Sequence, residues 1–255
     1  MPAGRFGGSI RNRKERGITD MSRKLFFCAA LAALLMMTAA FGAAQGVQVG
    51  DTVIFGHYEQ DNDLTNGQEP IEWRVLLVDG DVAQLISEYA LDAQPFNEKP
   101  AVARWTNCTL RTWLNDEFYN AAFDDEEKAA IITKEIENWK EDPTSDPVYL
   151  LSCDEAKQLF ANHQDRMATP TAYCIAQGAY QSTKYPLNRP KGMPGNAQWW
   201  LRTHSWESKF RAAYVAGSGG VMTCGGNSDG KVENTRWAVR PAIYVSVDAL
   251  ESAAQ

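Results

Sequence analysis

The sequence predicts an α+β fold, a mixed-sheet domain with central helices. Segments with strand periodicity come first, helical segments fill the middle of the chain, and strand-like segments return after residue 197. The strands do not alternate regularly with helices, as they would in a parallel α/β sheet. The order of the elements therefore favours an α+β arrangement.

Three strands are expected at the start of the folded region, at 51–57, 71–78 and 82–87. The second of them alternates apolar and polar residues, and the Asp-Gly-Asp sequence at 79–81 predicts a tight turn into the third. A polar segment at 59–70 connects the first two strands. These features together predict an antiparallel meander.

The middle of the chain is mainly helical. The strongest helix is expected at 109–123, capped by Thr109, because its apolar residues recur at helical spacing. Shorter helices are expected at 125–130, where acidic residues favour a helix N-terminus, at 154–160 and at 169–179. Further strands are expected at 131–136, 148–151, 198–202, 212–216, 220–224 and 237–247.

The first 44 residues differ from the rest of the chain. Residues 21–44 combine a basic start, an apolar run and small residues at 42 and 44, which is the pattern of a signal peptide. Residues 1–20 are polar and basic, and we interpret them as an over-extended start. The folded part is then one globular domain at 45–255, and we expect it to be secreted, extracellular or in the cell envelope.

Charge limits the partners of this domain. Residues 1–44 hold seven of the 25 basic residues and two of the 32 acidic ones, which leaves a net charge of −12 on residues 45–255. Such a surface repels phosphate backbones, so nucleic acid is not an expected partner. The apolar run at 25–41 falls short of the ~20 residues that a membrane span needs, and nothing downstream resembles a second span.

Four cysteines remain in this region, Cys108, Cys153, Cys174 and Cys224. Outside the cell they are candidates for up to two disulfides in any of three pairings. In a reducing habitat the same side chains would be small buried hydrophobic groups, and the sequence leaves both states open.

Six short phrases stand in order along the folded region. They are Gly-Asp-Thr-Val-Ile-Phe-Gly at 50–56, Glu-Trp-Arg-Val-Leu at 72–76, Cys-Thr-Leu-Arg-Thr-Trp-Leu-Asn at 108–115, Trp-Trp-Leu-Arg at 199–202, Ala-Tyr-Val at 213–215 and Val-Arg-Pro-Ala at 239–242. Together they resemble a bacterial family of secreted or surface domains, the domain-of-unknown-function family 6273. The resemblance extends over roughly residues 48–248, and the family has no known function to carry over.

The C-terminal half has a Trp-Leu-Arg strand, a glycine-rich stretch and a closing Val-Arg-Pro strand. In these features it resembles the C-type-lectin-type fold of formylglycine-generating enzymes and of the variable proteins of diversity-generating retroelements. This resemblance implies a ligand surface built from irregular loops near the last strands. It also implies that the loops are diversified if a near-copy of their coding segment, differing at adenines, lies nearby.

The loops at 203–211 and 225–236 are the predicted ligand surface. They combine aromatic and Arg side chains, which can act as rigid anchors, with Ser and Asn side chains, which adapt their hydrogen bonds. The alternative is an ordinary hairpin and loop with one aromatic in the core. The predicted ligand-binding residues are His204, Trp206, Phe210, Arg211, Tyr214, Asn227, Asn234 and Arg236.

A calcium site is a weaker candidate in the polar segment at 59–70. Asp61, Asp63 and Glu69, together with Thr65 and Glu72, follow the spacing of an EF-hand loop and offer the oxygen ligands that calcium prefers. However, Asn66 stands where that loop needs glycine. We therefore interpret the segment mainly as a hairpin loop, and we expect no other cofactor.

Catalytic signatures are weak. The three histidines share no metal-ligand spacing, and no Gly-x-Ser-x-Gly nucleophile motif occurs. The formylglycine-generating resemblance implies cysteine chemistry, for which Cys174 and Cys224 are the nearest candidates. Five tryptophans, at 73, 105, 113, 139 and 237, could form a carbohydrate platform but fit core positions better.

The sequence therefore predicts a secreted, non-catalytic binding module that recognises a glycan or protein ligand at the cell surface. The alternatives are a cysteine-dependent or other hydrolytic enzyme, and a structural protein of the envelope.

Overall fold

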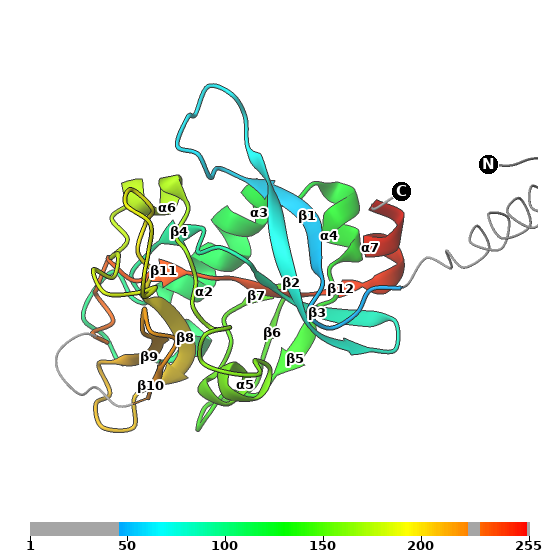
Figure 1. Ribbon diagram of the computed structural model, residues 1–255. Helices are drawn as coiled ribbons and strands as arrows, with labels where there is room; N and C mark the ends of the chain where they lie inside the picture. The colour runs from blue at the N-terminus through cyan, green and yellow to red at the C-terminus, as the bar shows by residue number, and fades with distance from the viewer. Residues whose placement is uncertain (1–45, 224–229, 254–255) are drawn as a thin grey trace, which may run out of the picture. The chain divides into compact units, whose positions relative to one another are not determined.

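The computed structural model describes residues 46–223 and 230–253, which combine helices with strands in several sheets (Figure 1). This mixture confirms the α+β prediction. Two five-stranded sheets form the framework, and a hairpin of β5 (Lys134–Ile136) and β6 (Thr144–Asp146) stands beside them.

The first sheet is antiparallel throughout and has the order β1-β2-β3-β12-β7. The meander expected from the sequence is present, with β2 and β3 joined at Gly80. The last strand of the chain, β12, pairs with β3, so the two ends of the described region meet in one sheet. The strands are β1 (Thr52–Tyr58), β2 (Glu69–Asp79), β3 (Val82–Ser87), β7 (Val148–Tyr149) and β12 (Ala242–Ser246).

The second sheet has the order β10-β9-β8-β11-β4. Its strands pair antiparallel except for β8 and β11, which are parallel. The strands are β4 (Asp92–Ala93), β8 (Trp199–His204), β9 (Ala212–Val215), β10 (Val221–Met222) and β11 (Ala238–Val239).

The prediction of a single strand at 237–247 was wrong. The chain leaves β11 in the second sheet, passes Arg240 and Pro241, and enters β12 in the first sheet. Proline has no N–H to donate, but the carbonyl of Pro241 accepts a hydrogen bond from Ser87 N at 3.0 Å. A final helix, α7 (Val247–Ala253), follows β12 and was not predicted.

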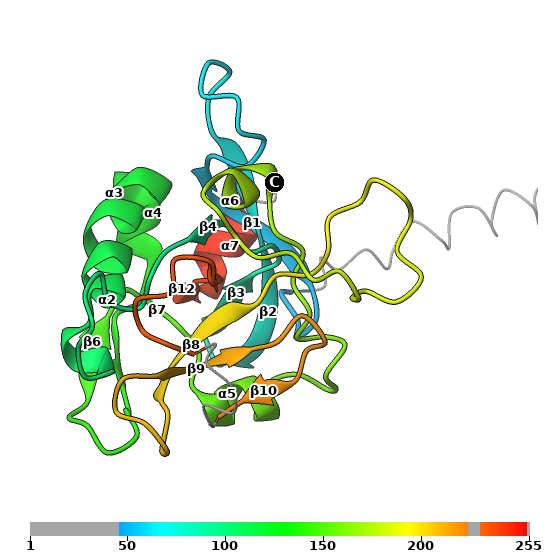
Figure 2. The same ribbon diagram turned by 90° about the vertical axis from the view of Figure 1, so that its left-hand side faces the viewer.

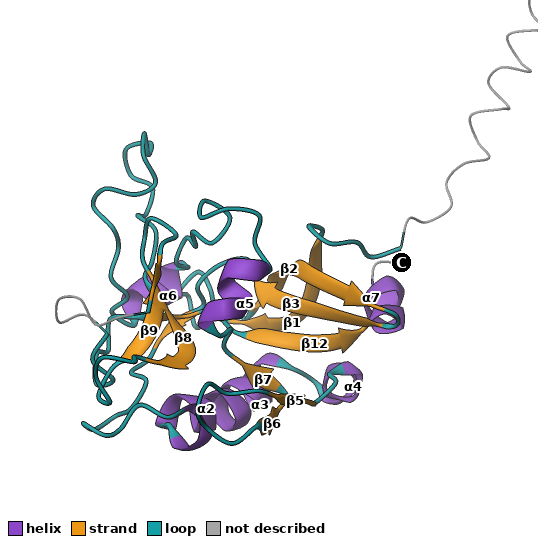
Figure 3. Cartoon of the chain, turned by 90° about the horizontal axis from the view of Figure 1, so that it is seen from below, coloured by secondary structure: helices purple, strands orange, loops and turns teal. Residues whose placement is uncertain are grey.

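The expected helix at 109–123 is present as a continuous helical segment, α2 (Thr109–Trp113), η2 (Leu114–Phe118) and α3 (Tyr119–Ala122), whose middle turn is π-helical. Its N-cap is Cys108 and not Thr109, because the Cys108 sulfur accepts from Arg111 N. Figures 2 and 3 show α2, α3 and α4 gathered on one side of the first sheet.

The shorter helices begin at polar caps. Helix α4 (Asp125–Ala130) begins with a capping box between Asp124 and Glu127, and α5 (Cys153–Gln158) begins with one between Ser152 and Glu155. The segment predicted as a helix at 169–179 is shorter, as α6 (Ala172–Ala176), with Thr171 as its cap. A 3₁₀ turn, η1 (Trp105–Asn107), precedes α2.

The six sequence phrases that carry the family resemblance contribute many core residues. Trp199, Trp200 and Leu201 are fully buried, and two arginines within these phrases, Arg202 and Arg240, are buried as well. Of the five tryptophans assigned to the core, four are buried or packed against it. The exception is Trp139, which is exposed.

Gly56 in β1 provides a test of this packing. Its φ of 73° is left-handed, and an added Cβ would lie 2.7 Å from both the Phe123 ring and the Ala122 carbonyl. Gly80 has a φ of 56° but nothing within 4 Å of an added Cβ. We expect Gly80→Ala to lower the free energy of unfolding by about 1 kcal/mol from backbone strain alone.

Gly56→Ala should lower the free energy of unfolding by about 2 to 4 kcal/mol, because overpacking against Phe123 and Ala122 adds to the same backbone strain. Urea unfolding of both variants measures the difference. Equal costs would show that the contact with Phe123 does not constrain β1.

Candidate functional site

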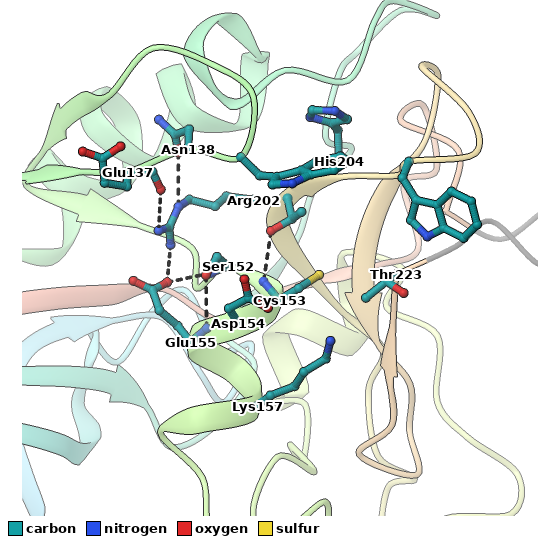
Figure 4. Close-up of a pocket in the computed structure, with 13 residues that line it drawn as sticks. Glu137, Asn138, Ser152, Cys153, Asp154, Glu155, Lys157, Arg202, His204 and Thr223 are labelled. Atoms are coloured by element: carbon teal, nitrogen blue, oxygen red, sulfur yellow. Dashed lines mark hydrogen bonds and ion pairs between the residues drawn. The ribbon is translucent and has the colours of Figure 1, made fainter.

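A surface pocket of 550 Å³ lies where three segments meet, namely the β5–β6 connection, the start of α5 and the end of β8 (Figure 4). Its polar lining comes from all three segments. Side chains in this lining include Asn138, Asp154, Lys157 and Thr203, and Thr223 after β10 contributes one more.

Arg202 forms a fixed wall of the pocket. Its guanidinium donates to Asn138 Oδ1 at 3.2 Å, to the Leu150 carbonyl at 2.9 Å and to the Glu137 carbonyl at 3.0 Å. It also forms an ion pair with Glu155. Because these bonds occupy the guanidinium, Arg202 shapes the pocket and joins its segments.

Helix α5 is attached to β8 by a second contact. Cys153 N donates to Thr203 Oγ1 at 3.0 Å, while the Glu155 carboxylate accepts from Ser152 N at 2.7 Å as part of the capping box. The start of α5 is therefore held in place from two sides. This arrangement fixes the polar side of the pocket before any ligand binds.

The aromatic side of the pocket is exposed. The side chain of Trp206 is 63% exposed and that of Trp139 is 42% exposed, although indoles normally lie mostly buried. The Trp139 ring lies 4.7 Å from the His204 ring, and Lys140 Nζ lies 4.4 Å from the Trp139 ring centroid. Two partly exposed indole rings therefore line the pocket beside polar groups.

His204 is oriented by a buried carboxylate. Its Nδ1 lies 3.2 Å from Glu141 Oε1, and Glu141 Oε2 accepts from Thr106 N at 3.1 Å and from Thr106 Oγ1 at 3.0 Å. With Glu141 as acceptor, Nδ1 carries the proton and Nε2 remains for another partner. The ring therefore has one defined orientation at the pocket.

The structure brings two of the predicted ligand residues, His204 and Trp206, into this pocket. Phe210 and Arg211 follow on the β8–β9 connection, outside its lining, and Phe210 is exposed. Tyr214 was predicted as a surface anchor, but its side chain is 6% exposed and its ring stacks on a core indole. All four residues of β9 are buried, so Tyr214 belongs to the core and not to a ligand surface.

The remaining predicted residues lie elsewhere. Asn234 Oδ1 accepts from Arg236 N at 3.0 Å, and the Arg236 guanidinium lies 5.3 Å from the Tyr180 ring centroid. These residues are not in the lining of the pocket. Asn227 lies outside the described residues.

Sequence reasoning missed the β5–β6 and α5 contributions, and it assigned Trp139 to the core after weighing it as part of a carbohydrate platform. A signal was present, because Trp139 stands in a run of polar and charged residues, Glu-Asn-Trp-Lys-Glu-Asp at 137–142. An indole without apolar neighbours in the sequence is a poor core candidate.

The cysteines in the described region are buried free thiols. Cys108, Cys153 and Cys174 form no disulfide with one another, and Cys224 lies outside the described residues. Burial raises the pKa of Cys108 to about 12 and raises that of Cys174 well above its usual range. Cys174 Sγ donates to the Asp92 carbonyl at 3.1 Å, so this thiol is neutral and poorly suited to nucleophilic chemistry.

Acidic side chains gather at the β1–β2 connection. Asp61 and Glu69, two of the three calcium candidates, approach Glu59, which the sequence did not suggest. Asp63 lies outside this cluster, and Glu72 belongs to β2.

The fold and pocket define an α+β domain with a preformed, partly aromatic surface site. Residues 80–247 match the domain of unknown function DUF6273, and the chain belongs to this family. The match includes the pocket but not the β1–β2 hairpin. Neither a curated protein nor a solved structure matches the chain.

Within the described part of the chain, every helix is too short or too polar to span a membrane.

Proposed function

We propose that this protein is an exported, non-catalytic binding module that recognises a glycan at the cell surface through the pocket beside Trp139 and Trp206. The observation that carries the proposal is the pair of exposed indole rings at a 550 Å³ pocket with polar walls. Ligand sites of this size combine apolar surface with a few placed polar groups.

A glycan fits this combination better than a charged ligand does. The C–H faces of a sugar ring stack on indoles, while its hydroxyls both donate and accept hydrogen bonds. The pocket offers acceptors such as Asp154 and donors such as Lys157, and its one buried cation, Arg202, is already bound by protein groups. Sugar hydroxyls can bond to both the donors and the acceptors, and an uncharged ligand brings no charge of its own into the pocket.

Two further features support the wider proposal. The basic and apolar pattern at 21–44 is typical of exported proteins. The second sheet, with irregular connections around β8, β9 and β10, is compatible with the C-type-lectin-like arrangement that we propose for the C-terminal half.

The function is tested by screening purified protein against an oligosaccharide array and a panel of surface proteins. We expect saturable binding to one class of oligosaccharide, and competition by the same sugar free in solution. Binding to surface proteins but to no oligosaccharide would show that the ligand is a protein and not a glycan. Absence of any ligand would contradict the binding function.

A further inference from the structure

The connection between β1 and β2, which projects from the first sheet at the top of Figure 1, brings three carboxylates together. One carboxylate oxygen from each of Glu59, Asp61 and Glu69 lies within 4.8 Å of the others. Among residues 46–223 and 230–253, no Lys or Arg forms an ion pair with any of the three. Their mutual repulsion is therefore not balanced by a nearby protein cation.

Glu59 provides the observation that points to a ligand. Its side chain is only 7% exposed, and its Oε1 has no hydrogen-bond partner. A buried carboxylate oxygen without a partner is costly, because native proteins satisfy nearly all such atoms.

The other two carboxylates are already held in position. Asp61 accepts from Asp63 N at 2.7 Å and from Asn66 Nδ2 at 2.8 Å. Glu69 Oε2 accepts from Gln60 N at 2.7 Å and from Asp61 N at 3.3 Å. These bonds do not involve Glu69 Oε1, and each Asp61 oxygen can accept a second interaction, so both carboxylates are oriented but can still bind a ligand.

We propose that Glu59, Asp61 and Glu69 bind one calcium ion. Carboxylate oxygens are the ligands that calcium prefers, and its flexible coordination suits an irregular connection better than the octahedral geometry that magnesium requires. The three ligands include no His or Cys, which soft or borderline metals favour. Water completes the coordination on the open side, where Asp61 and Glu69 also line a shallow surface hollow.

This site differs from the EF-hand spacing seen in the sequence. Asp63 Oδ1 accepts from Thr65 N at 3.1 Å and from Thr65 Oγ1 at 2.6 Å, so Asp63 closes a local turn. The third ligand is Glu59, directly after β1, and it replaces Asp63. The ion therefore joins the end of β1 to the first residue of β2.

Calcium should also stabilise a longer-range contact. Tyr173 N in α6 donates to the Gln60 carbonyl at 2.9 Å, and Gln60 lies between two of the ligands. A bound ion would fix the backbone at Gln60 and so stabilise the contact between the β1–β2 hairpin and α6. The inference is independent of the glycan pocket, which is formed by other segments.

The test is calorimetric titration of the purified, chelator-treated protein with calcium chloride at pH 7.5, beside Glu59→Gln and Asp63→Asn. Extracellular calcium sites have Kd values of about 10⁻⁴ to 10⁻³ M, so the titration should extend to about 10 mM. We expect one saturable site in the unmodified protein, with affinity at least about tenfold weaker in Glu59→Gln. Magnesium should bind more weakly than calcium.

Asp63→Asn is the matched control, because it removes one negative charge from the same connection but keeps an oxygen for the turn. Its affinity should stay within about threefold of the unmodified protein. Equal calcium affinity in Glu59→Gln and the unmodified protein would overturn the proposal. So would the absence of binding heat in the unmodified protein, a result that does not depend on the folding of any variant.

Discussion

Replacing Arg240 by alanine is expected to lower the free energy of unfolding by about 4 kcal/mol, within the range for losing a large buried side chain. Arg240 is fully buried between the two sheets, and its guanidinium donates to the Ser87 carbonyl at 2.7 Å and to the Glu88 carbonyl at 3.3 Å. It also lies 5.3 Å from the Trp199 ring centroid. Removal leaves a cavity and buried carbonyls without donors.

The charge of Arg240 persists at neutral pH even though burial lowers its pKa to about 10. Arg240→Lys should therefore recover only part of the lost stability, because an ammonium keeps the charge but cannot reproduce the planar fork of donors. The transition is measured by urea unfolding, followed through tryptophan fluorescence.

The control is Arg74→Ala, which removes an arginine from a partly exposed ion pair with Glu88. Such pairs contribute about 0 to 1 kcal/mol. A cost for Arg240→Ala no greater than that of Arg74→Ala would contradict the structural role given to the Val-Arg-Pro phrase.

Replacing Arg202 by methionine is expected to lower the free energy of unfolding by about 3 kcal/mol, because methionine keeps much of the side-chain volume but removes every hydrogen-bond donor. The Glu137 and Leu150 carbonyls lose their partner, and the Glu155 carboxylate loses its cation. Glu155 is partly exposed, so water compensates part of this loss. Lys157→Met is the control in the same pocket and should change stability by no more than about 0.5 kcal/mol.

A double-mutant cycle with Glu155→Gln separates the ion pair from the other bonds of Arg202. We expect a coupling energy of about 1 to 2 kcal/mol, typical of a contacting pair in one network. Additive costs would show that Glu155 serves only as the cap of α5.

Local elements could be predicted from the sequence where one periodicity dominated. The alternation in 71–78 and the turn at 79–81 predicted the meander, and the apolar stripe from Leu110 to Phe118 predicted the central helical segment. Acidic residues predicted α4, where Asp124 and Glu127 form the capping box. In each of these cases neighbouring residues determine the structure.

Long-range arrangement could not be predicted in the same way. The segment at 237–247 has uniform strand character, and only the pairing of β11 with β8 and of β12 with β3 divides it between two sheets. The pocket joins residues near 139, 154 and 204, and nothing local in any one segment indicates the other two. The sequence therefore suggested His204 and Trp206 without their neighbours.

The acidic cluster shows a related limit. Counting positions from Asp61 placed Asp63 and Glu72 in a calcium loop, because spacing was the only available guide. The antiparallel register of β1 and β2 instead pairs Tyr58 with Glu69, and this brings Glu59 next to Glu69. Spacing rules fail when a turn other than the assumed one sets the geometry.

The most direct test of the binding account is the affinity of Trp139→Ala and Trp206→Ala for the glycan found by the array, compared with that of Phe210→Ala. Phe210 is an exposed aromatic on the same β8–β9 connection but lies outside the pocket lining, so it controls for general surface hydrophobicity. We predict that each tryptophan variant, while folded, binds at least about tenfold more weakly, a loss of about 1.4 kcal/mol, and that Phe210→Ala binds like the unmodified protein. Unchanged affinity in both tryptophan variants would contradict the assignment of the pocket as the ligand site.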